Sequence, residues 1–367
     1  MGNRKNEIID VEERGTEVAK VREGQFSYEP PQWLEGAKKH IYVGLIASVL
    51  ITFIWFLAKD ITRGVAVAII ITAAVIFLLR FALGFAVAKK PGKARFLANL
   101  FFTLITVITF FSVTILGIAP KVLFRPNSDE KAFAVLAECE DAEELSIKTE
   151  NGVLSGWLLH QSENPAPLVL YFNGNGGNAS AAVNRLLEDP KKLECFEGCH
   201  FACVDYPSYG KSEGRISDDM LRTYALEVYD YLINRPEVTE IIVMGYSLGT
   251  GVANHLASQR DVTELILMAP YADGYDLYNN IMNIFYGPLR LLVTYKMDAV
   301  IYAKAVEIKP LILASPMDEL VPYNSSTRLF QAYPNGCDFV TVDGIGHGDF
   351  WDNQTVLNKI SEYVKER

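Results

Sequence analysis

The chain has 367 residues, of which 50% are hydrophobic, and its formal net charge is −10 at pH 7. This length accommodates one large domain together with an accessory region. Because binding to phosphates needs basic patches, the excess of acidic residues argues against a nucleic-acid partner.

Polar residues fill the stretch 1–40, and three long apolar runs follow at 41–58, 65–88 and 96–119. Arg80 is the only charged residue within these runs. Each run is long enough to cross a hydrocarbon core of ~30 Å, which takes ~20 helical residues. We therefore predict a polar N-terminal tail, 1–40, and a region of three transmembrane helices, 41–119, with the lipid bilayer as partner. The alternative is three buried core helices of a soluble protein.

The basic residues that flank the three runs are unevenly distributed. Among those near the runs, eight lie before the first run or between the second and third (Lys20, Arg22, Lys38, Lys39, Lys89, Lys90, Lys93 and Arg95), whereas five lie on the other side (Lys59, Arg63, Lys121, Arg125 and Lys131). Since cytoplasmic loops carry the excess of Lys and Arg, this predicts a cytoplasmic N-terminus and an extracytoplasmic C-terminal domain. A single charge inside the runs gives little support to a transport path.

After a connector at 120–144, short β-rich runs alternate with helical stretches. The later runs are continuously apolar, which is typical of parallel strands buried on both faces. The alternation predicts an α/β fold over 145–367, with a doubly wound, mostly parallel sheet and an active site at the carboxyl ends of its strands. The predicted strands are 145–149, 153–159, 167–172, 200–205, 240–245, 264–269, 310–315 and 338–342; the predicted helices are 179–188, 217–234, 248–259, 324–333 and 349–365.

A glycine-rich loop, 173–178, follows the third predicted strand and reads Asn-Gly-Asn-Gly-Gly-Asn. A phosphate-binding loop is the competing interpretation. It fails because the loop lacks the Lys and the Ser or Thr of a P-loop, and also the glycine spacing of a dinucleotide-binding turn.

Five cysteines all follow the apolar region, and an odd number does not describe a disulfide framework. Cys195 and Cys199 could pair in an oxidising space. Zinc ligation by Cys195, Cys199 and His200 is an alternative, but their spacing matches no common zinc site, so we predict no metal.

The candidate nucleophile is Ser247, in the sequence Gly-Tyr-Ser-Leu-Gly at 245–249. An apolar run precedes this sequence and a helical stretch follows it, as in the nucleophile elbow of serine hydrolases. The backbone N–H of Leu248 is the first candidate donor to an oxyanion, and the glycine-rich loop is expected to supply the second, with Asn175 as its best candidate. Gly174, Gly176 and Tyr246 are candidate substrate-binding residues.

A serine nucleophile needs a base and a carboxylate that orients the base. His347 stands between two glycines straight after the last predicted strand, and we predict that it is the base. Asp318 follows the strand 310–315 and is the predicted acid, although the adjacent Glu319 could substitute for it. The order Ser, Asp, His is that of the α/β-hydrolase arrangement.

These motifs together resemble the α/β-hydrolase superfamily over roughly 140–365. The likeness is greatest to a membrane-anchored branch with a GN-x-GN loop, a DYPGYGKSEG-like segment (here 205–214), GYSLG, D-x-x-VP and a GHGD-like base loop. The chain departs from this pattern at Asn173, Ser208 and Ser315–Pro316, which affects the shape of the pocket and removes no catalytic group. The resemblance implies hydrolysis of an ester, thioester or amide through an acyl-enzyme, without a metal or organic cofactor.

The residues 271–305 form an insertion before the strand that carries the predicted acid, and they are rich in Tyr, Ile and Leu. Such residues at helical spacing indicate packing onto the domain or, alternatively, a lid that lines an acyl pocket. With the predicted anchor, the lid interpretation favours a lipid-like acyl substrate. A serine peptidase or amidase of the same fold and a non-catalytic binding module on a hydrolase scaffold are the alternatives.

Overall fold

This computed structural model describes residues 123–281 and 283–365, together with scattered positions between 42 and 108. The chain divides into two compact units, Met1–Thr114 and Ile115–Arg367. The described residues of the first unit are helical. Most of the three predicted spans, at 41–58, 65–88 and 96–119, lies outside the described residues. In the part of the chain that is described, no helix has both the length and the apolar character needed to cross a membrane.

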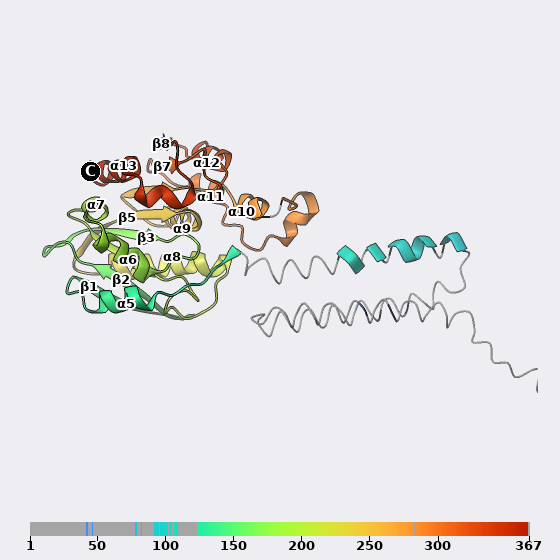
Figure 1. Ribbon diagram of the computed structural model, residues 1–367, viewed down its shortest axis with the longest axis horizontal. Coiled ribbons are helices and arrows are strands. Elements are labelled where there is room, and N and C mark those ends of the chain that lie inside the picture. Colours follow the sequence, from blue (N-terminus) through green and yellow to red (C-terminus); the bar gives the residue numbers. More distant parts are fainter. Residues whose placement is uncertain are drawn as a thin grey trace, which may run out of the picture. The chain divides into compact units, whose positions relative to one another are not determined.

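The second unit is built on an eight-stranded sheet with the order β1-β2-β4-β3-β5-β6-β7-β8. β2 is antiparallel to both of its neighbours, and every pairing from β4 to β8 is parallel. Figure 1 shows β1 at one edge of the sheet and β8 at the other. The strands are β1 (Ala142–Thr149), β2 (Gly152–Leu159), β3 (Ala166–Phe172), β4 (His200–Val204), β5 (Val238–Tyr246), β6 (Glu264–Met268), β7 (Leu311–Ala314) and β8 (Asp338–Thr341).

The structure confirms the eight predicted strands and the mostly parallel sheet, and each of the five predicted helices has a counterpart. The last of these begins later than predicted, because the 3-10 helix η2 (His347–Asp352) precedes it. The helices are α5 (Glu130–Ala137), α6 (Ala179–Glu188), α7 (Pro190–Glu194), α8 (Asp218–Ile233), α9 (Leu248–Ala257), α10 (Gly274–Ile281), α11 (Ala299–Ala303), α12 (Tyr323–Phe330) and α13 (Gln354–Lys365), with a second 3-10 helix η1 (Gly287–Leu292).

The stretch 120–144, predicted as a connector, contains α5 and the start of β1. The side chain of Asp129 begins α5 by accepting a hydrogen bond from the backbone N–H of Ala132 at 2.9 Å. The inward face of this helix buries Leu136. β1 is an edge strand with few buried positions. Its first residues are acidic, so in the sequence they look like part of a loop.

Helices cover both faces of the sheet, which gives three layers (Figure 1). Alternate side chains of one strand enter opposite cores. In β3, Leu168 and Leu170 pack with α8, α9 and α12, whereas Val169 and Tyr171 pack with α6 and α13. Because β3, β5, β7 and β8 run in the same direction, the loops that leave their carboxyl ends meet at one edge of the layered domain.

Candidate active site

Ser247 lies between the end of β5 and the start of α9, where the chain turns sharply. Its backbone has φ 52° and ψ −116°, a conformation that non-glycine residues adopt rarely and that is common at functional turns. The turn packs tightly against β3. A Cβ atom added to Gly249 would lie 2.1 Å from the carbonyl oxygen of Phe172, which leaves room only for glycine.

His347 lies beside this serine, at the start of η2. Its Nε2 is 2.9 Å from Oγ of Ser247, which is hydrogen-bonding distance. The hydroxyl of Tyr246 donates to the backbone oxygen of His347, and the two rings stack with their centroids 5.3 Å apart. The backbone N–H of His347 donates to the carboxylate of Glu319 at 3.0 Å. The backbone of His347 is therefore held at its oxygen and at its N–H, and its ring is held by the stacked Tyr246.

Asp318 supplies the carboxylate that orients this imidazole. Its two oxygens lie 2.8 and 3.0 Å from Nδ1 of His347. The backbone N–H groups of Leu320 and Val321 donate to the same carboxylate at 2.9 and 2.8 Å and fix its position. The structure thus brings Ser247, His347 and Asp318 together in one chain of hydrogen bonds. Glu319, the alternative acid, faces the backbone of His347, and the hydrogen bond from that N–H lowers the pKa of its carboxyl.

The two candidate oxyanion donors lie on the same cavity as the nucleophile. Within the described part of the chain, the backbone N–H groups of Leu248 and Asn175 donate to no acceptor, so both are available to a ligand. The cavity, called the catalytic pocket below, has a volume of about 250 Å³. It is lined by Leu123, Arg125, Gly174, Asn175, Tyr246, Ser247, Leu248, Leu277, Asn280, Ile281, Leu320, Val321 and His347.

The side chain of Asn175 is fixed by a segment that the sequence did not mark as functional. The backbone N–H of Arg125 donates to its Oδ1 at 2.9 Å, and the hydroxyl of Tyr209 donates to the same oxygen at 2.9 Å. Its Nδ2 donates to the carbonyl oxygen of Leu123. Asn127 adds a hydrogen bond to the carbonyl oxygen of Gly176 at 3.2 Å. The residues directly before α5 therefore support the candidate oxyanion loop.

The segment 205–214 supports the same loop from the other side. The carboxylate of Asp205 accepts a hydrogen bond from the backbone N–H of Ala179 at 2.7 Å. The hydroxyl of Tyr206 donates to the carbonyl oxygen of Asn173 at 2.7 Å. Asp205 is buried, and burial raises the pKa of its carboxyl to about 6. This position explains the resemblance of the segment to a family motif, although none of these side chains lines the catalytic pocket.

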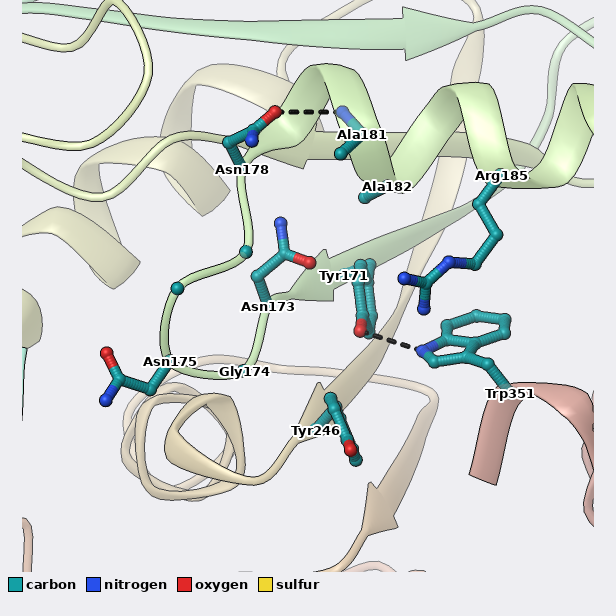
Figure 2. A pocket seen from close by; sticks show the side chains of 12 residues that line it. Tyr171, Asn173, Gly174, Asn175, Asn178, Ala181, Ala182, Arg185, Tyr246 and Trp351 are labelled. Carbon is teal, nitrogen blue, oxygen red and sulfur yellow. Dashed lines mark hydrogen bonds between the residues drawn. The ribbon is translucent and has the colours of Figure 1, made fainter. Parts of the chain in front are cut away.

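A second cavity of about 250 Å³, called the side pocket below, adjoins the catalytic pocket. The two share Gly174, Asn175 and Tyr246. Figure 2 shows the side pocket between the loop 173–178, α6 and Trp351. Of the predicted substrate-binding residues, Gly174 and Tyr246 thus line both cavities, whereas Gly176 lines the side pocket alone.

One cluster elsewhere has the composition of a metal site. Glu143, His160 and Glu237 offer ligand atoms within 4.8 Å of one another. The guanidinium of Arg235 already forms hydrogen bonds to both carboxylates, so the cluster is an ion-pair network at the opposite end of β5 from Ser247. Among the described residues, Cys195, Cys199 and His200 do not bring their ligand atoms together in such a group.

Two buried side chains lie outside both pockets: Cys195, for which the sequence allowed a disulfide with Cys199, and His255. The thiol of Cys195 donates to the backbone oxygen of Lys191 at 3.2 Å and forms no disulfide with Cys199. His255 packs edge-on against Tyr302, with the ring centroids 4.9 Å apart, as expected of a packed rather than catalytic histidine. Burial lowers the pKa of His255 to about 4, so this ring is neutral near pH 7.

The strand order and the elbow define the α/β-hydrolase fold. Residues 167–302 match the family model described as alpha/beta hydrolase fold, and residues 294–366 match one described as TAP-like protein. The chain therefore has the α/β-hydrolase fold, and these matches support a hydrolase.

The chain is also similar to individual proteins. The chain is 29% identical to an uncharacterized protein of Mycobacterium tuberculosis over 61% of this chain and 79% of that protein. It is 28% identical to human protein ABHD12B over 46% of this chain and 50% of that protein. Among solved structures, an esterase of Pyrococcus furiosus is similar with a TM-score of 0.52 at 18% identity, over 66% of this chain and 96% of the esterase.

Proposed function

We propose that this protein is a membrane-anchored serine hydrolase that cleaves carboxylic esters or thioesters with lipid-like acyl groups. One observation carries the proposal. Oγ of Ser247 lies 2.9 Å from Nε2 of His347, while Nδ1 of the same ring lies 2.8 Å from the Asp318 carboxylate. A nucleophile, a base and an orienting acid in this arrangement are what acyl transfer to serine requires.

In the first half of the reaction, Oγ of Ser247 attacks the carbonyl carbon of the substrate and its proton passes to Nε2 of His347. The carbonyl oxygen becomes an oxyanion that the backbone N–H groups of Leu248 and Asn175 can bind. One such donor contributes ~3–4 kcal/mol to transition-state stabilisation. The bond to the alcohol or thiol then breaks, and the leaving group takes the proton from His347. The acyl group remains on Ser247.

In the second half, a water molecule attacks the acyl carbon and gives a proton to Nε2 of His347. The bond between the carbon and Oγ breaks, Oγ recovers the proton, and the carboxylic acid leaves. Asp318 keeps the proton of His347 on Nδ1 throughout, so that Nε2 faces the serine as an acceptor. The two halves consume one water molecule and regenerate the enzyme.

The lining of the catalytic pocket supports an apolar acyl group. Leu123, Leu277, Ile281, Leu320 and Val321 present aliphatic side chains to the cavity. Two of them come from α10, the first helix of the insertion 271–305, for which the sequence left packing onto the domain and a lid as alternatives. Further apolar side chains of this insertion and of the loop that carries Asp318 are exposed: Ile284, Tyr286, Leu289, Leu291 and Met317.

The membrane anchor is proposed from the sequence: three uncharged or nearly uncharged runs precede the catalytic domain. Leu123, which lines the catalytic pocket, follows the predicted end of the third span by four residues, and four extended residues reach at most ~14 Å. The excess of Lys and Arg on the N-terminal side favours a cytoplasmic N-terminus and an extracytoplasmic catalytic domain. Digestion of intact cells by an added protease tests this topology, and protection of the domain would contradict it.

A fluorophosphonate probe, which reacts with activated serines, tests the nucleophile. We expect the wild type to be labelled and Ser247→Ala to lose all labelling, while Ser162→Ala, a matched change in a surface loop, keeps it. Labelling of Ser247→Ala at the wild-type rate would show that Ser247 is not the nucleophile. A panel of acyl esters, thioesters and aminoacyl amides then distinguishes the proposed reaction from that of a peptidase, because a peptidase would cleave the aminoacyl amides as well as the esters.

A further inference from the structure

The side pocket has less apolar lining than the catalytic pocket. Its side-chain lining includes Asn173, Asn175, Asn178 and the hydroxyl of Tyr171, and its single charged side chain is that of Arg185. Figure 2 shows Arg185 reaching from α6 toward Tyr171 and Trp351. The two pockets share three residues beside Ser247. A molecule that places one group in the side pocket can therefore place another at the nucleophile.

The charged side chains that line the two pockets are opposite in sign to the net charge of the whole chain. The protein has 44 acidic against 34 basic residues. Yet the residues that line the two pockets include Arg125 and Arg185 and no Asp or Glu. Among the described residues, Arg185 has no carboxylate within ion-pairing distance. A cleft lined by one sign of charge attracts ligands of the opposite sign.

The side pocket also contains hydrogen-bond donors without acceptors. The hydroxyl of Tyr171 accepts a hydrogen bond from Nε1 of Trp351 at 3.0 Å, which leaves its own proton for another acceptor. Burial raises the pKa of Tyr171, so this hydroxyl stays a neutral donor. Nδ2 of Asn178 is buried and has no acceptor in the described part of the chain. Buried donors of this kind are rare unless a ligand or water completes them.

We propose that the side pocket binds a carboxylate or phosphate on the alcohol part of the substrate, with Arg185 as its counter-ion. This inference rests on the proposed hydrolase function and names its substrate class: an acyl ester with an anionic alcohol part. The aliphatic catalytic pocket takes the acyl chain, and the arginine holds the other end of the same molecule. An arginine in this position binds either anion through two parallel hydrogen bonds.

Three octanoyl esters that differ only in the alcohol part test the proposal with the full-length protein in detergent. The alcohols are 3-hydroxypropanoate, 2-hydroxyethyl phosphate and the neutral 3-hydroxypropanamide. We expect the wild type to prefer at least one anionic ester to the neutral one by about tenfold in kcat/KM, and the two anionic arms identify which anion fits. High salt reduces this preference, because it screens the charge on an exposed arginine.

Variants assign the preference to Arg185. Arg185→Ala should raise KM for the preferred anionic ester by about 10- to 100-fold, the loss expected for charge-assisted hydrogen bonds, and change the neutral ester by less than about twofold. Arg185→Lys should restore part of the loss, because the charge remains. Arg215→Ala, a matched change of an exposed arginine outside both pockets, should change neither ester.

Three results would overturn the proposal. The wild type could favour the neutral ester, or Arg185→Ala could weaken hydrolysis of anionic and neutral esters equally. In the third, the preference for the anionic ester is lost in Arg125→Ala and kept in Arg185→Ala. Each leaves the hydrolase function intact, because the neutral ester is still cleaved. If no ester is hydrolysed and the probe does not label Ser247, the hydrolase function itself is wrong.

Discussion

The backbone N–H of Arg125 donates to Oδ1 of Asn175 at 2.9 Å, across fifty residues of sequence. This bond ties the segment after the predicted third span to the loop that carries a candidate oxyanion donor. Tyr209 and Leu123 complete the attachment of the same side chain. The side-chain amide of Asn175 thus fixes the backbone of this residue, which lines the catalytic pocket.

Replacement of this side chain tests the relationship. Asn175→Ala keeps the backbone N–H and removes all of these hydrogen bonds, so the donor loses its fixed position. We expect kcat to fall by about 10- to 100-fold with little change in KM, since a donor misplaced by an ångström costs about that much. Asn184→Ala, which removes an exposed side-chain hydrogen bond on α6, should leave kcat unchanged. An unchanged kcat in Asn175→Ala would show that the loop is held without this amide.

Replacement of the two adjacent carboxylates, Asp318 and Glu319, should affect kcat very differently. Asp318→Asn retains the shape of the side chain but favours the wrong tautomer of His347, and we expect kcat to fall by about 10⁴-fold. Glu319→Gln keeps an oxygen that accepts from the backbone N–H of His347, so the loss should stay below about tenfold. Single-turnover rates of probe labelling measure both effects. Equal losses in the two variants would mean that Asp318 has no special role.

The close contact between the elbow and β3 should make Gly249 intolerant of any side chain. In Gly249→Ala the new Cβ would lie 2.1 Å from the carbonyl oxygen of Phe172, so α9 must move away from the sheet. Overpacking of this kind costs about 1–3 kcal/mol of the free energy of unfolding. Gly348→Ala, where the added Cβ meets nothing within 4 Å, is the matched control. Similar melting temperatures for the two variants would contradict the contact.

The sequence predicts the positions of Ser247, Asp318 and His347 well because each follows a strand. Strands of a parallel sheet share one carboxyl edge, so residues distant in sequence converge there once the strands are recognised. The apolar runs before 247 and 318 are continuous, which makes those strands easy to recognise, whereas the strand before 347 is shorter and more polar and is recognised by its place in the alternation. The order of the strands, with β4 between β2 and β3, comes from the structure.

Other parts of the site could not be predicted, because their function comes from contacts without a local pattern. Arg125 acts through its backbone N–H, which any residue except proline has. Arg185 is an exposed residue of an amphipathic helix, where arginine is ordinary, and only the fold places it beside Trp351. Asp205 lies in a recognisable motif, but the motif does not reveal that its carboxyl receives the backbone N–H of Ala179.

Asp205 should make the stability of the domain depend on pH. Burial raises the pKa of its carboxyl from 3.8 to about 6, so the folded state binds this proton more tightly than the unfolded state does. The contribution of this carboxyl to the free energy of unfolding is fully present below about pH 4 and is lost as pH rises through about 6. A difference of about two units corresponds to about 3 kcal/mol. In Asp205→Asn, which cannot ionise, this part of the pH dependence is absent.

Thermal unfolding of the full-length protein in detergent, at intervals between pH 4 and pH 7.5, measures the effect. Between these limits the melting temperature of the wild type should fall relative to that of Asp205→Asn by about 5–10 °C, given ~2–4 °C per kcal/mol for a domain of this size. Other titrating groups contribute equally to both proteins, so the difference between the two curves isolates Asp205. Parallel curves would mean that the hydrogen bonds from Ala179 and Lys211 keep the carboxylate ionised in spite of its burial.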